Sequence, residues 1–288
     1  MSRTRVELCT VKGRASLHHE GHIADVERRS QGLFSSDPMD ALNRWIEFCS
    51  WASGLPATAV DTALDLSELG PCVPRPQQVF AIGLNYRDHA VESGLPPPKQ
   101  PMVFTKFPSC LTGARAPVAL TSDTVDWEVE LVVVMARRAR AVRAEAALEY
   151  VAGYCVGQDL SDRGLQFADA PPQFSLSKSA PGFGPIGPWL VADPTYDWRQ
   201  RTLTCDIDGV RMQTGSTRDM VFGVPELVAY LSLHCTLLPG DLIFTGTPAG
   251  VGSGRKPRMY LRPGTVIRSE IDGLGVLENT CTGAAPAQ

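Results

Sequence analysis

Short apolar runs, separated by glycine and proline, dominate the hydrophobic pattern of this chain. Runs of β-branched and aromatic residues, some alternating with polar ones, predict strands. They lie at residues 4–11, 14–18, 22–26, 79–84, 102–106, 126–134, 150–156, 202–207, 210–213, 259–261, 266–271 and 274–278, and a further strand starts at residue 242. Helical spacing of apolar residues is confined to residues 38–52, 144–150 and 224–235. The pattern therefore predicts an α+β fold that is rich in strands.

The pattern also divides the chain into a small N-terminal part and a larger remainder. A proline-containing polar connection at residues 69–76 closes the first part. We therefore expect a small N-terminal α+β domain with its linker at residues 1–74, a main domain at residues 75–282 and a tail at residues 283–288.

The composition excludes several classes of protein. A hydrophobic content of 43% suffices for a sizeable core, and a net charge of −4 without any basic block excludes nucleic acid as a partner. No apolar run reaches the ~18–20 residues of a membrane span, and we find no signal peptide. The eight cysteines are scattered without a CxxC pair, as is typical of reduced thiols. We expect a cytoplasmic protein.

Two acidic residues stand at the start of the most apolar strand. Glu128 and Glu130 project from the same face of that strand, about 7 Å apart along it. Neighbouring carboxylates repel one another, and a cation between them relieves the repulsion. Asp159 follows another predicted strand, and three carboxylates without nearby His or Cys suit Mg²⁺ or Mn²⁺. The alternative is an edge strand whose two glutamates face water.

A histidine and a glutamate share one face of a predicted helical turn. His89 and Glu92 are three residues apart, so they can form a hydrogen bond. A carboxylate held against an imidazole raises its basicity and fixes its tautomer, as a general base requires. An exposed helix with an incidental pair is the alternative. The glycine- and proline-rich residues 93–101 that follow form either a surface loop or the flank of a lid.

Further polar residues follow Asp159. Arg163 and Gln166, one turn apart, could hold the carboxylate and carbonyl groups of an anionic substrate. Alternatively, Arg163 neutralises Asp159 or Asp162. Lys178 is one of five lysines in an arginine-rich chain, and it either stabilises charge near the metal or lies at the surface.

A glycine-rich turn at residues 245–252 has free amide groups that could cradle a carboxylate. It lacks the GxGxxG and GK[ST] patterns of nucleotide-binding loops. This disfavours a nucleotide-binding oxidoreductase.

These segments, in this order, resemble the fumarylacetoacetate hydrolase superfamily, and in particular its bacterial fumarylacetoacetase-like and acylpyruvase-like members. The resemblance covers roughly residues 75–280. The matching segments are residues 83–86 with Asp88, His89 and Glu92; 128–131; 153–154 with Asp159, Leu160, Ser161 and Arg163; Lys178; 185–189; Gln213; and 245–248 with 250–252.

The resemblance implies a mixed β-roll for residues 75–282 as the catalytic domain, usually in a homodimer. It implies Mg²⁺ or Mn²⁺ as the cofactor, held by Glu128, Glu130 and Asp159. His89 and Glu92 would form a dyad on a lid that orders over the substrate. The other implied site residues are Lys178 for catalysis and Tyr86, Arg163, Gln166, Gly246 and Thr247 for substrate binding.

The resemblance also implies a reaction, the metal-dependent cleavage of a C–C bond in a 2-oxo or β-diketo acid such as an acylpyruvate or a fumarylacetoacetate-like compound. The metal would chelate the 2-oxo acid and stabilise the enolate that is released. Lys178 would add positive charge, and His89 would activate a water molecule for hydrolysis. An oxaloacetate-type decarboxylase (a lyase), an enol–keto isomerase or hydratase, and a non-catalytic scaffold or binding member remain alternatives.

The sequence departs from the family pattern at three places. Gly164 stands where many relatives carry an acidic residue, residues 254–260 lack the usual pair of prolines, and Thr265 stands where Gly-Asp is common. None of these positions is an implied metal ligand. Because of these departures, the resemblance does not determine the acyl group of the substrate or the pathway.

Overall fold

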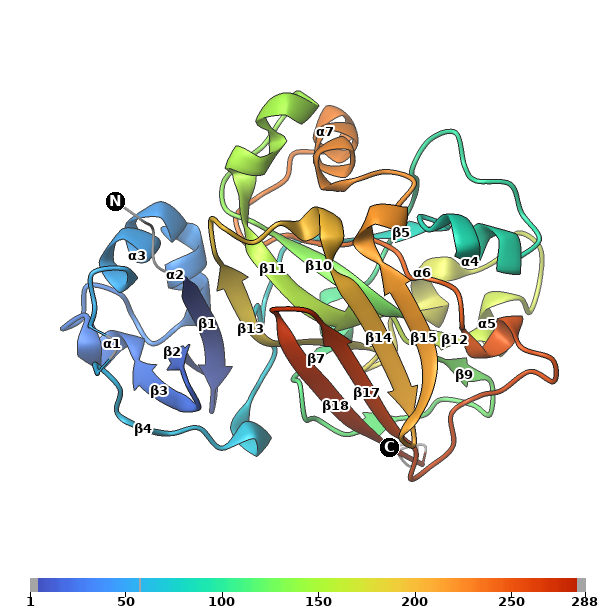
Figure 1. Cartoon of the computed structure of the whole chain (residues 1–288), viewed down its shortest axis with the longest axis horizontal. Coiled ribbons are helices and arrows are strands. Elements are labelled where there is room, and N and C mark those ends of the chain that lie inside the picture. Colours follow the sequence, from blue (N-terminus) through green and yellow to red (C-terminus); the bar gives the residue numbers. More distant parts are fainter. Residues whose placement is uncertain (1–4, 57, 284–288) are drawn as a thin grey trace.

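The computed structural model describes residues 5–56 and 58–283, so residues 284–288 of the expected tail lie outside the described residues. Most strands belong to one long, mixed sheet (Figure 1). Its order is β4 (Thr62–Ala63), β3 (His22–Asp25), β2 (Arg14–His19), β1 (Val6–Val11), β13 (Gly184–Ala192), β11 (Val151–Gln158), β10 (Val129–Met135), β16 (Leu242–Phe244), β5 (Val79–Gly83) and β6 (Met102–Thr105), and β7 (Leu111–Thr112) pairs with β13.

A second sheet has five strands and contacts the long sheet through β13, β11 and β10. Its order is β15 (Val210–Ser216), β14 (Thr202–Ile207), β17 (Val266–Ile271), β18 (Gly275–Thr282) and β8 (Val118–Ala119), and a separate pair joins β12 (Ser161–Asp162) to β9 (Val125–Asp126). The prediction of a strand-rich α+β fold is confirmed.

The helices are short. The α-helices are α1 (Val26–Arg29), α2 (Pro38–Asn43), α3 (Trp45–Ala52), α4 (Arg87–Glu92), α5 (Arg163–Gln166), α6 (Phe174–Ser177) and α7 (Val224–His234). The 3₁₀ turns are η1 (Leu66–Glu68), η2 (Pro108–Cys110), η3 (Ala144–Tyr150), η4 (Trp198–Gln200), η5 (Thr217–Asp219) and η6 (Gly252–Gly254). Among the described residues, no helix is both long and apolar enough to cross a membrane.

The N-terminal strands continue the long sheet. β1 pairs antiparallel with β13, and β2, β3 and β4 follow outwards (Figure 1). The helix expected at residues 38–52 begins as predicted, because the Asp37 carboxylate caps it by accepting the Met39 N–H over 2.9 Å. It is interrupted at Arg44, whose φ of −120° is not helical, and so forms α2 and α3. The division into domains at residue 74 stays a prediction.

Three other expected elements differ in detail. The strand expected at residues 126–134 is interrupted at Trp127 and Glu128, and residues 144–150 form a 3₁₀ helix. The prediction of a strand at residues 259–261 is wrong. Met259 donates its N–H to Gly252 and Leu261 donates to Val125, so this segment makes single bonds to a turn and to β9 instead of forming a ladder.

β10 is the central strand of the core and is buried along its whole length. Val132 and Val134 face one hydrophobic cluster, whereas Leu131, Val133 and Met135 face the other. Because β11 and β16 flank it, the alternative of an edge strand with water-facing glutamates is wrong.

The strand directions bring four chain segments to one edge of the long sheet. β16 and β5 run parallel, so the turns that follow them leave the sheet on the same side. β10 runs antiparallel to β16, and β11 runs antiparallel to β10. The start of β10 and the end of β11 therefore meet the ends of β16 and β5. All four segments carry residues that the sequence predicts for the site.

Candidate metal centre and active site

Three buried carboxylates converge at this edge of the sheet. Glu128 precedes β10, Glu130 lies within it, and Asp159 follows β11. The N–H of Asp159 donates to the carbonyl oxygen of Glu128 over 2.9 Å, which extends the ladder between the two strands. One oxygen from each carboxylate lies within 4.8 Å of the others. The sequence prediction that these three residues meet is confirmed.

The ammonium group of Lys178 lies between two of these carboxylates. Lys178 follows α6, and its Nζ donates to Glu128 Oε2, Asp159 Oδ2 and Ser161 Oγ, each over 2.7 Å. Only 3% of its side chain is exposed, so the alternative of a surface lysine is wrong. A charged donor at this position stabilises negative charge on the carboxylates or on an oxygen bound beside them.

A second lysine, which the sequence analysis does not assign to the site, contacts the same cluster. Lys106 follows β6, and its Nζ donates to Asp159 Oδ1 over 2.7 Å. It also donates to the carbonyl oxygens of Lys178 and of Phe183, the latter over 3.2 Å. Because these three acceptors use its three N–H groups, Lys106 holds Asp159 and the backbone of Lys178 in place.

Arg163, at the start of α5, is surrounded by acceptors. Its Nε donates to Asp126 Oδ2 over 2.9 Å, and its guanidinium also donates to Glu128 Oε1 over 2.5 Å and to Gln166 Oε1 over 2.8 Å. The alternative in which Arg163 neutralises Asp159 or Asp162 is therefore wrong, because its carboxylate partners are Asp126 and Glu128. Whether Arg163 and Gln166 also touch a substrate stays a prediction.

The electrostatics of the cluster suit a divalent cation. Four carboxylates, including that of Asp126, face three cationic groups, so one negative charge is left over when all four carboxylates are ionised. Burial would raise the pKa of Glu128, but the charges of Lys178, Arg163 and His89 hold it below its ordinary value. Burial and the charges of Asp159 and Glu128 raise the pKa of Glu130 well above its ordinary value. These hard oxygen donors fit Mg²⁺ or Mn²⁺, and a cation would relieve the repulsion around Glu130.

The histidine–glutamate pair forms on α4. His89 Nδ1 lies 3.1 Å from Glu92 Oε2, and both side chains are largely buried. The other oxygen of Glu92 accepts the N–H of Gly250 over 3.0 Å. His89 is packed inside the protein and is only 8% exposed. The alternative of an exposed helix is therefore wrong.

The other predicted contacts surround Glu130. Gly246, at a φ of +98°, donates its N–H to Glu130 Oε2 over 2.7 Å. Thr247 donates its hydroxyl to the Val129 carbonyl over 2.9 Å and accepts from Gln213 over 2.8 Å. Both residues thus hold the start of β10, and their contact with a substrate stays a prediction.

Tyr86 differs from these residues, because its hydroxyl has no hydrogen-bond partner among the described residues. The side chain is fully buried, and the Tyr86 hydroxyl makes no hydrogen bond to any residue that the structure describes. Burial, followed by the charge of Glu130, raises the pKa of Tyr86 well above its ordinary range. A buried hydroxyl without a partner is costly, and a ligand beside Glu130 could satisfy it.

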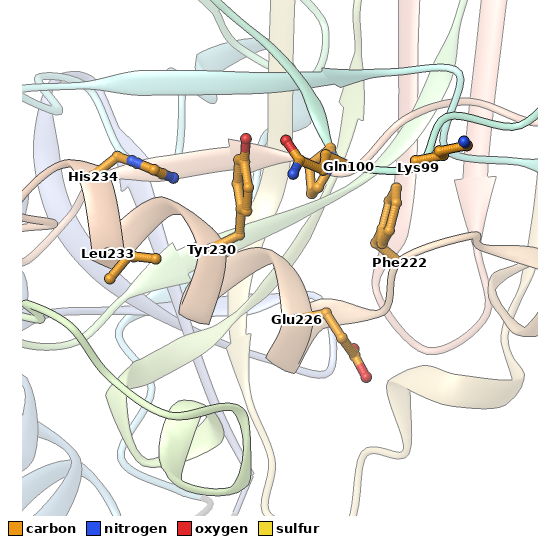
Figure 2. Close-up of a pocket in the computed structure, with 8 residues that line it drawn as sticks. Lys99, Gln100, Phe222, Glu226, Tyr230, Leu233 and His234 are labelled. Atoms are coloured by element: carbon orange, nitrogen blue, oxygen red, sulfur yellow. The ribbon is translucent and has the colours of Figure 1, made fainter.

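A surface groove lies apart from the carboxylates, between α7 and the segment that precedes β6 (Figure 2). It has a volume of about 540 Å³, and its lining consists of Lys99, Gln100, Pro101, Phe222, Glu226, Tyr230, Leu233 and His234. These residues do not include any of the three carboxylates or the histidine–glutamate pair. The groove is therefore separate from the candidate site.

A match to one protein-family model shows which family this chain belongs to. It is described as "Fumarylacetoacetate (FAA) hydrolase C-terminal" and covers residues 78–282. The chain belongs to the fumarylacetoacetate hydrolase family. This confirms the resemblance seen in the sequence, and the matched range contains every candidate site residue.

Individual relatives of this fumarylacetoacetate hydrolase family member support the assignment. A protein from Burkholderia ambifaria named "Putative hydrolase" is 48% identical over 211 residues, or 72% of this chain and 74% of that protein. A "putative HpcE protein" from Mycobacterium smegmatis is 44% identical, with a TM-score of 0.91 over 98% of this chain and 100% of that one. Maleylpyruvate hydrolase from Sphingobium sp. SYK-6, in complex with manganese(II) ion and pyruvate, is 25% identical, with a TM-score of 0.81 over 97% of this chain and 100% of that one.

Proposed function

We propose that this chain is a divalent-metal-dependent hydrolase that cleaves a C–C bond in a 2-oxo or β-diketo acid of the acylpyruvate type. The observation that carries the proposal is the buried trio Glu128, Glu130 and Asp159. The pair of His89 and Glu92 is connected to it by hydrogen bonds, from Glu92 to Gly250 and from Gly252 through Asp126 and Arg163 to Glu128. The bound manganese(II) and pyruvate of the maleylpyruvate hydrolase support a metal and a 2-oxo acid for this chain.

Glu128, Glu130 and Asp159 would hold the ion, either Mg²⁺ or Mn²⁺. When bound, a divalent ion acts as a Lewis acid that polarises a 2-oxo group. Lys178 brings a buried ammonium group to the same place, because its Nζ bridges Glu128 and Asp159. Its charge stabilises an oxygen that becomes negative while the C–C bond breaks.

His89 acts as the general base in this proposal. Its Nδ1 faces Glu92, which favours the tautomer with the proton on Nδ1 and leaves Nε2 free to accept a proton from water. The hydroxide that forms as the proton leaves attacks the distal acyl carbonyl. Glu92 stabilises the imidazolium and is itself held by the Gly250 N–H. The C–C bond then breaks, and the imidazolium gives its proton to the carbon of the released enolate. The products are a carboxylic acid and pyruvate or a similar 2-oxo acid.

A comparison of substrates and metals tests this proposal. Acylpyruvate and oxaloacetate are each incubated with Mn²⁺, with Mg²⁺ and with EDTA. We expect metal-dependent loss of the acylpyruvate enol absorbance together with release of acid. Carbon dioxide released from oxaloacetate alone would make the protein a decarboxylase. Binding of metal with no reaction of either compound would favour an isomerase or hydratase, and no binding of metal would favour a scaffold.

Replacing Glu92 by Gln separates hydrolysis from decarboxylation. Gln keeps the size of the side chain but cannot stabilise a charged imidazolium. We expect hydrolysis of acylpyruvate to fall by about 10²–10⁴-fold, the usual contribution of a general base. Decarboxylation needs no attacking water, so it should be less affected. An unchanged rate of hydrolysis would rule out the dyad.

We also propose that the protein forms a homodimer. Val103, Phe107, Leu165, Phe167 and Leu176 are large apolar residues on or beside β6, α5 and α6, and each is at least 38% exposed. α6 contacts both β6 and α5, and α5 and α6 lie near one another in Figure 1. A second copy would remove this apolar surface from water. Size-exclusion chromatography with light scattering tests this proposal, and replacing Phe167 by Asp should shift a dimer towards the monomer.

A further inference from the structure

One turn of the chain contacts both acidic side chains of α4. The N–H of Ala249 donates to Asp88 Oδ2 over 3.3 Å, and the N–H of Gly250 donates to Glu92 Oε1 over 3.0 Å. α4 has only six residues, and its N-cap Tyr86 makes no side-chain capping bond. So short a helix depends on contacts outside itself. The turn at residues 249–254 provides two such contacts.

The other side of this turn is bound by Asp126, which ends β9 two residues before Glu128. The fully buried carboxylate of Asp126 accepts the N–H groups of Gly252 over 2.6 Å, Ser253 over 3.0 Å and Trp127 over 2.8 Å, and Nε of Arg163 over 2.9 Å. Four donors on one carboxylate make this a rigid joint. A continuous series of hydrogen bonds therefore connects Glu128, through Arg163 and Asp126, to the turn.

Gly254 leaves no room for a side chain between the turn and Glu92 of α4. A Cβ atom added to Gly254 would lie 2.5 Å from Cδ and 2.6 Å from Cγ of Glu92. Gly254 itself is exposed, and its backbone does not have a positive φ, so an alanine there strains no backbone. A single methyl group at this position would therefore displace the carboxylate of Glu92.

We propose that residues 249–254, held by Asp126, form a latch that positions Glu92, and through it His89, beside the metal centre. One oxygen of Glu92 is bound by the latch and the other faces His89, so the latch sets the direction from which the imidazole is held. Asp126 and Gly254 are positioning residues. The effect of the latch on catalysis rests on the proposed role of the dyad in hydrolysis.

The variant Gly254→Ala tests the latch, and Gly283→Ala is its matched control. A Cβ added to Gly283 would have no atom of a described residue within 4 Å apart from its chain neighbours, and its φ is likewise not positive. We expect Gly254→Ala to lower kcat for acylpyruvate about 10²-fold, as a displaced catalytic group does. Its affinity for Mn²⁺, measured by calorimetry, should not change, because the trio is untouched. Gly283→Ala should match the wild type in both measurements.

Hydrogen exchange separates the latch from the proposed reaction. The amides of residues 88–95 should exchange at least about tenfold faster in Gly254→Ala than in the wild type or in Gly283→Ala, because α4 loses its support. A wild-type protein that hydrolyses no acylpyruvate would defeat the proposed function, and the exchange rates would still decide the latch. Exchange and turnover equal to those of the wild type would overturn the latch.

Asp126→Asn gives an independent measurement at the other end of the latch. An amide NH₂ would face donors that now point at a carboxylate, so the turn and Arg163 should both loosen. We expect faster exchange at residues 88–95 together with weaker binding of Mn²⁺. The loss of metal affinity distinguishes this variant from Gly254→Ala. Protected α4 amides in a folded Asp126→Asn protein would contradict the latch.

Discussion

The ammonium group of Lys106 donates a hydrogen bond to Oδ1 of Asp159 over 2.7 Å, and neither side chain is exposed to solvent. Removing one partner of a buried ion pair leaves the charge of the other partner buried without an opposite charge beside it. We expect Lys106→Met to lower the free energy of unfolding of the metal-free protein by about 3–5 kcal/mol. Urea denaturation measures this change.

Lys12→Met is the control for this prediction, because Lys12 forms an exposed pair with Glu68 over 2.7 Å. Its loss should change the free energy of unfolding far less than the loss of Lys106, because water screens the charges of an exposed pair. Equal effects of the two substitutions would contradict a special role for the buried pair.

The neighbouring ligands Glu128 and Glu130 should respond differently to replacement by glutamine. Glu128 is ionised and bound to Lys178 and Arg163, so Glu128→Gln should destabilise the metal-free protein by about 3–5 kcal/mol. The raised pKa of Glu130 favours its neutral form, which glutamine imitates. Glu130→Gln should therefore change stability little.

Both substitutions should weaken binding of Mn²⁺ by more than about 100-fold, because losing a ligand costs more than losing a residue that supports one. Calorimetric titration measures the affinity and thermal unfolding measures the stability. Retained Mn²⁺ affinity in either variant would remove that residue from the metal site.

The pH dependence of metal binding follows from the raised pKa of Glu130. This carboxyl group must lose its proton to bind a cation. Between the ordinary pKa of 4.5 and the raised one, the folded metal-free protein holds a proton that the unfolded chain has lost. The contribution of Glu130 to stability is therefore present below pH 4.5 and is lost as pH rises through the raised pKa.

Below the raised pKa, the apparent affinity for Mn²⁺ should fall about tenfold for each pH unit of acidification. Binding in that range should release one proton from Glu130, which titration in buffers of different ionisation enthalpy detects. An affinity that stays constant as pH falls would show that Glu130 is already ionised in the metal-free protein.

The unpartnered hydroxyl of Tyr86 leads to a prediction about substrate binding. Tyr86→Phe removes a buried group that makes no hydrogen bond to the described residues, so stability should stay the same or rise by up to about 1 kcal/mol. KM for acylpyruvate should rise if the hydroxyl binds the substrate. Steady-state kinetics and thermal unfolding check the two effects. A clear loss of stability would indicate a structural partner for the hydroxyl.

The carboxylate trio was predictable because its signal is local. Alternation in a strand places Glu128 and Glu130 on one face, and the order of the motifs adds Asp159. His89 and Glu92 are likewise set by helical spacing. In each case a short stretch of sequence determines which side chains point the same way.

The supporting residues were not predictable in this way. Lys106 ends an alternating strand, where a lysine is usually exposed, and its partner Asp159 lies 53 residues further along the chain. Asp126 lies two residues before Glu128 in the sequence, but three of its four donors come from the distant residues 163, 252 and 253. Such contacts depend on how β10, β11 and the glycine-rich turn pack. The rarity of lysine in this chain was the one available hint for Lys106.

The pairing of β1 with β13 has a consequence for how this protein can vary. The pairs Val6↔Ala192, Glu7↔Val191 and Leu8↔Leu190 are joined through main-chain groups, which recognise strand direction and register rather than side-chain identity. The side chains of the N-terminal segment can therefore change without loss of its pairing with β13. This agrees with a family match that begins at residue 78. Its loss would turn the end of β13 into an open edge that another chain could join, so these strands also protect the protein against aggregation.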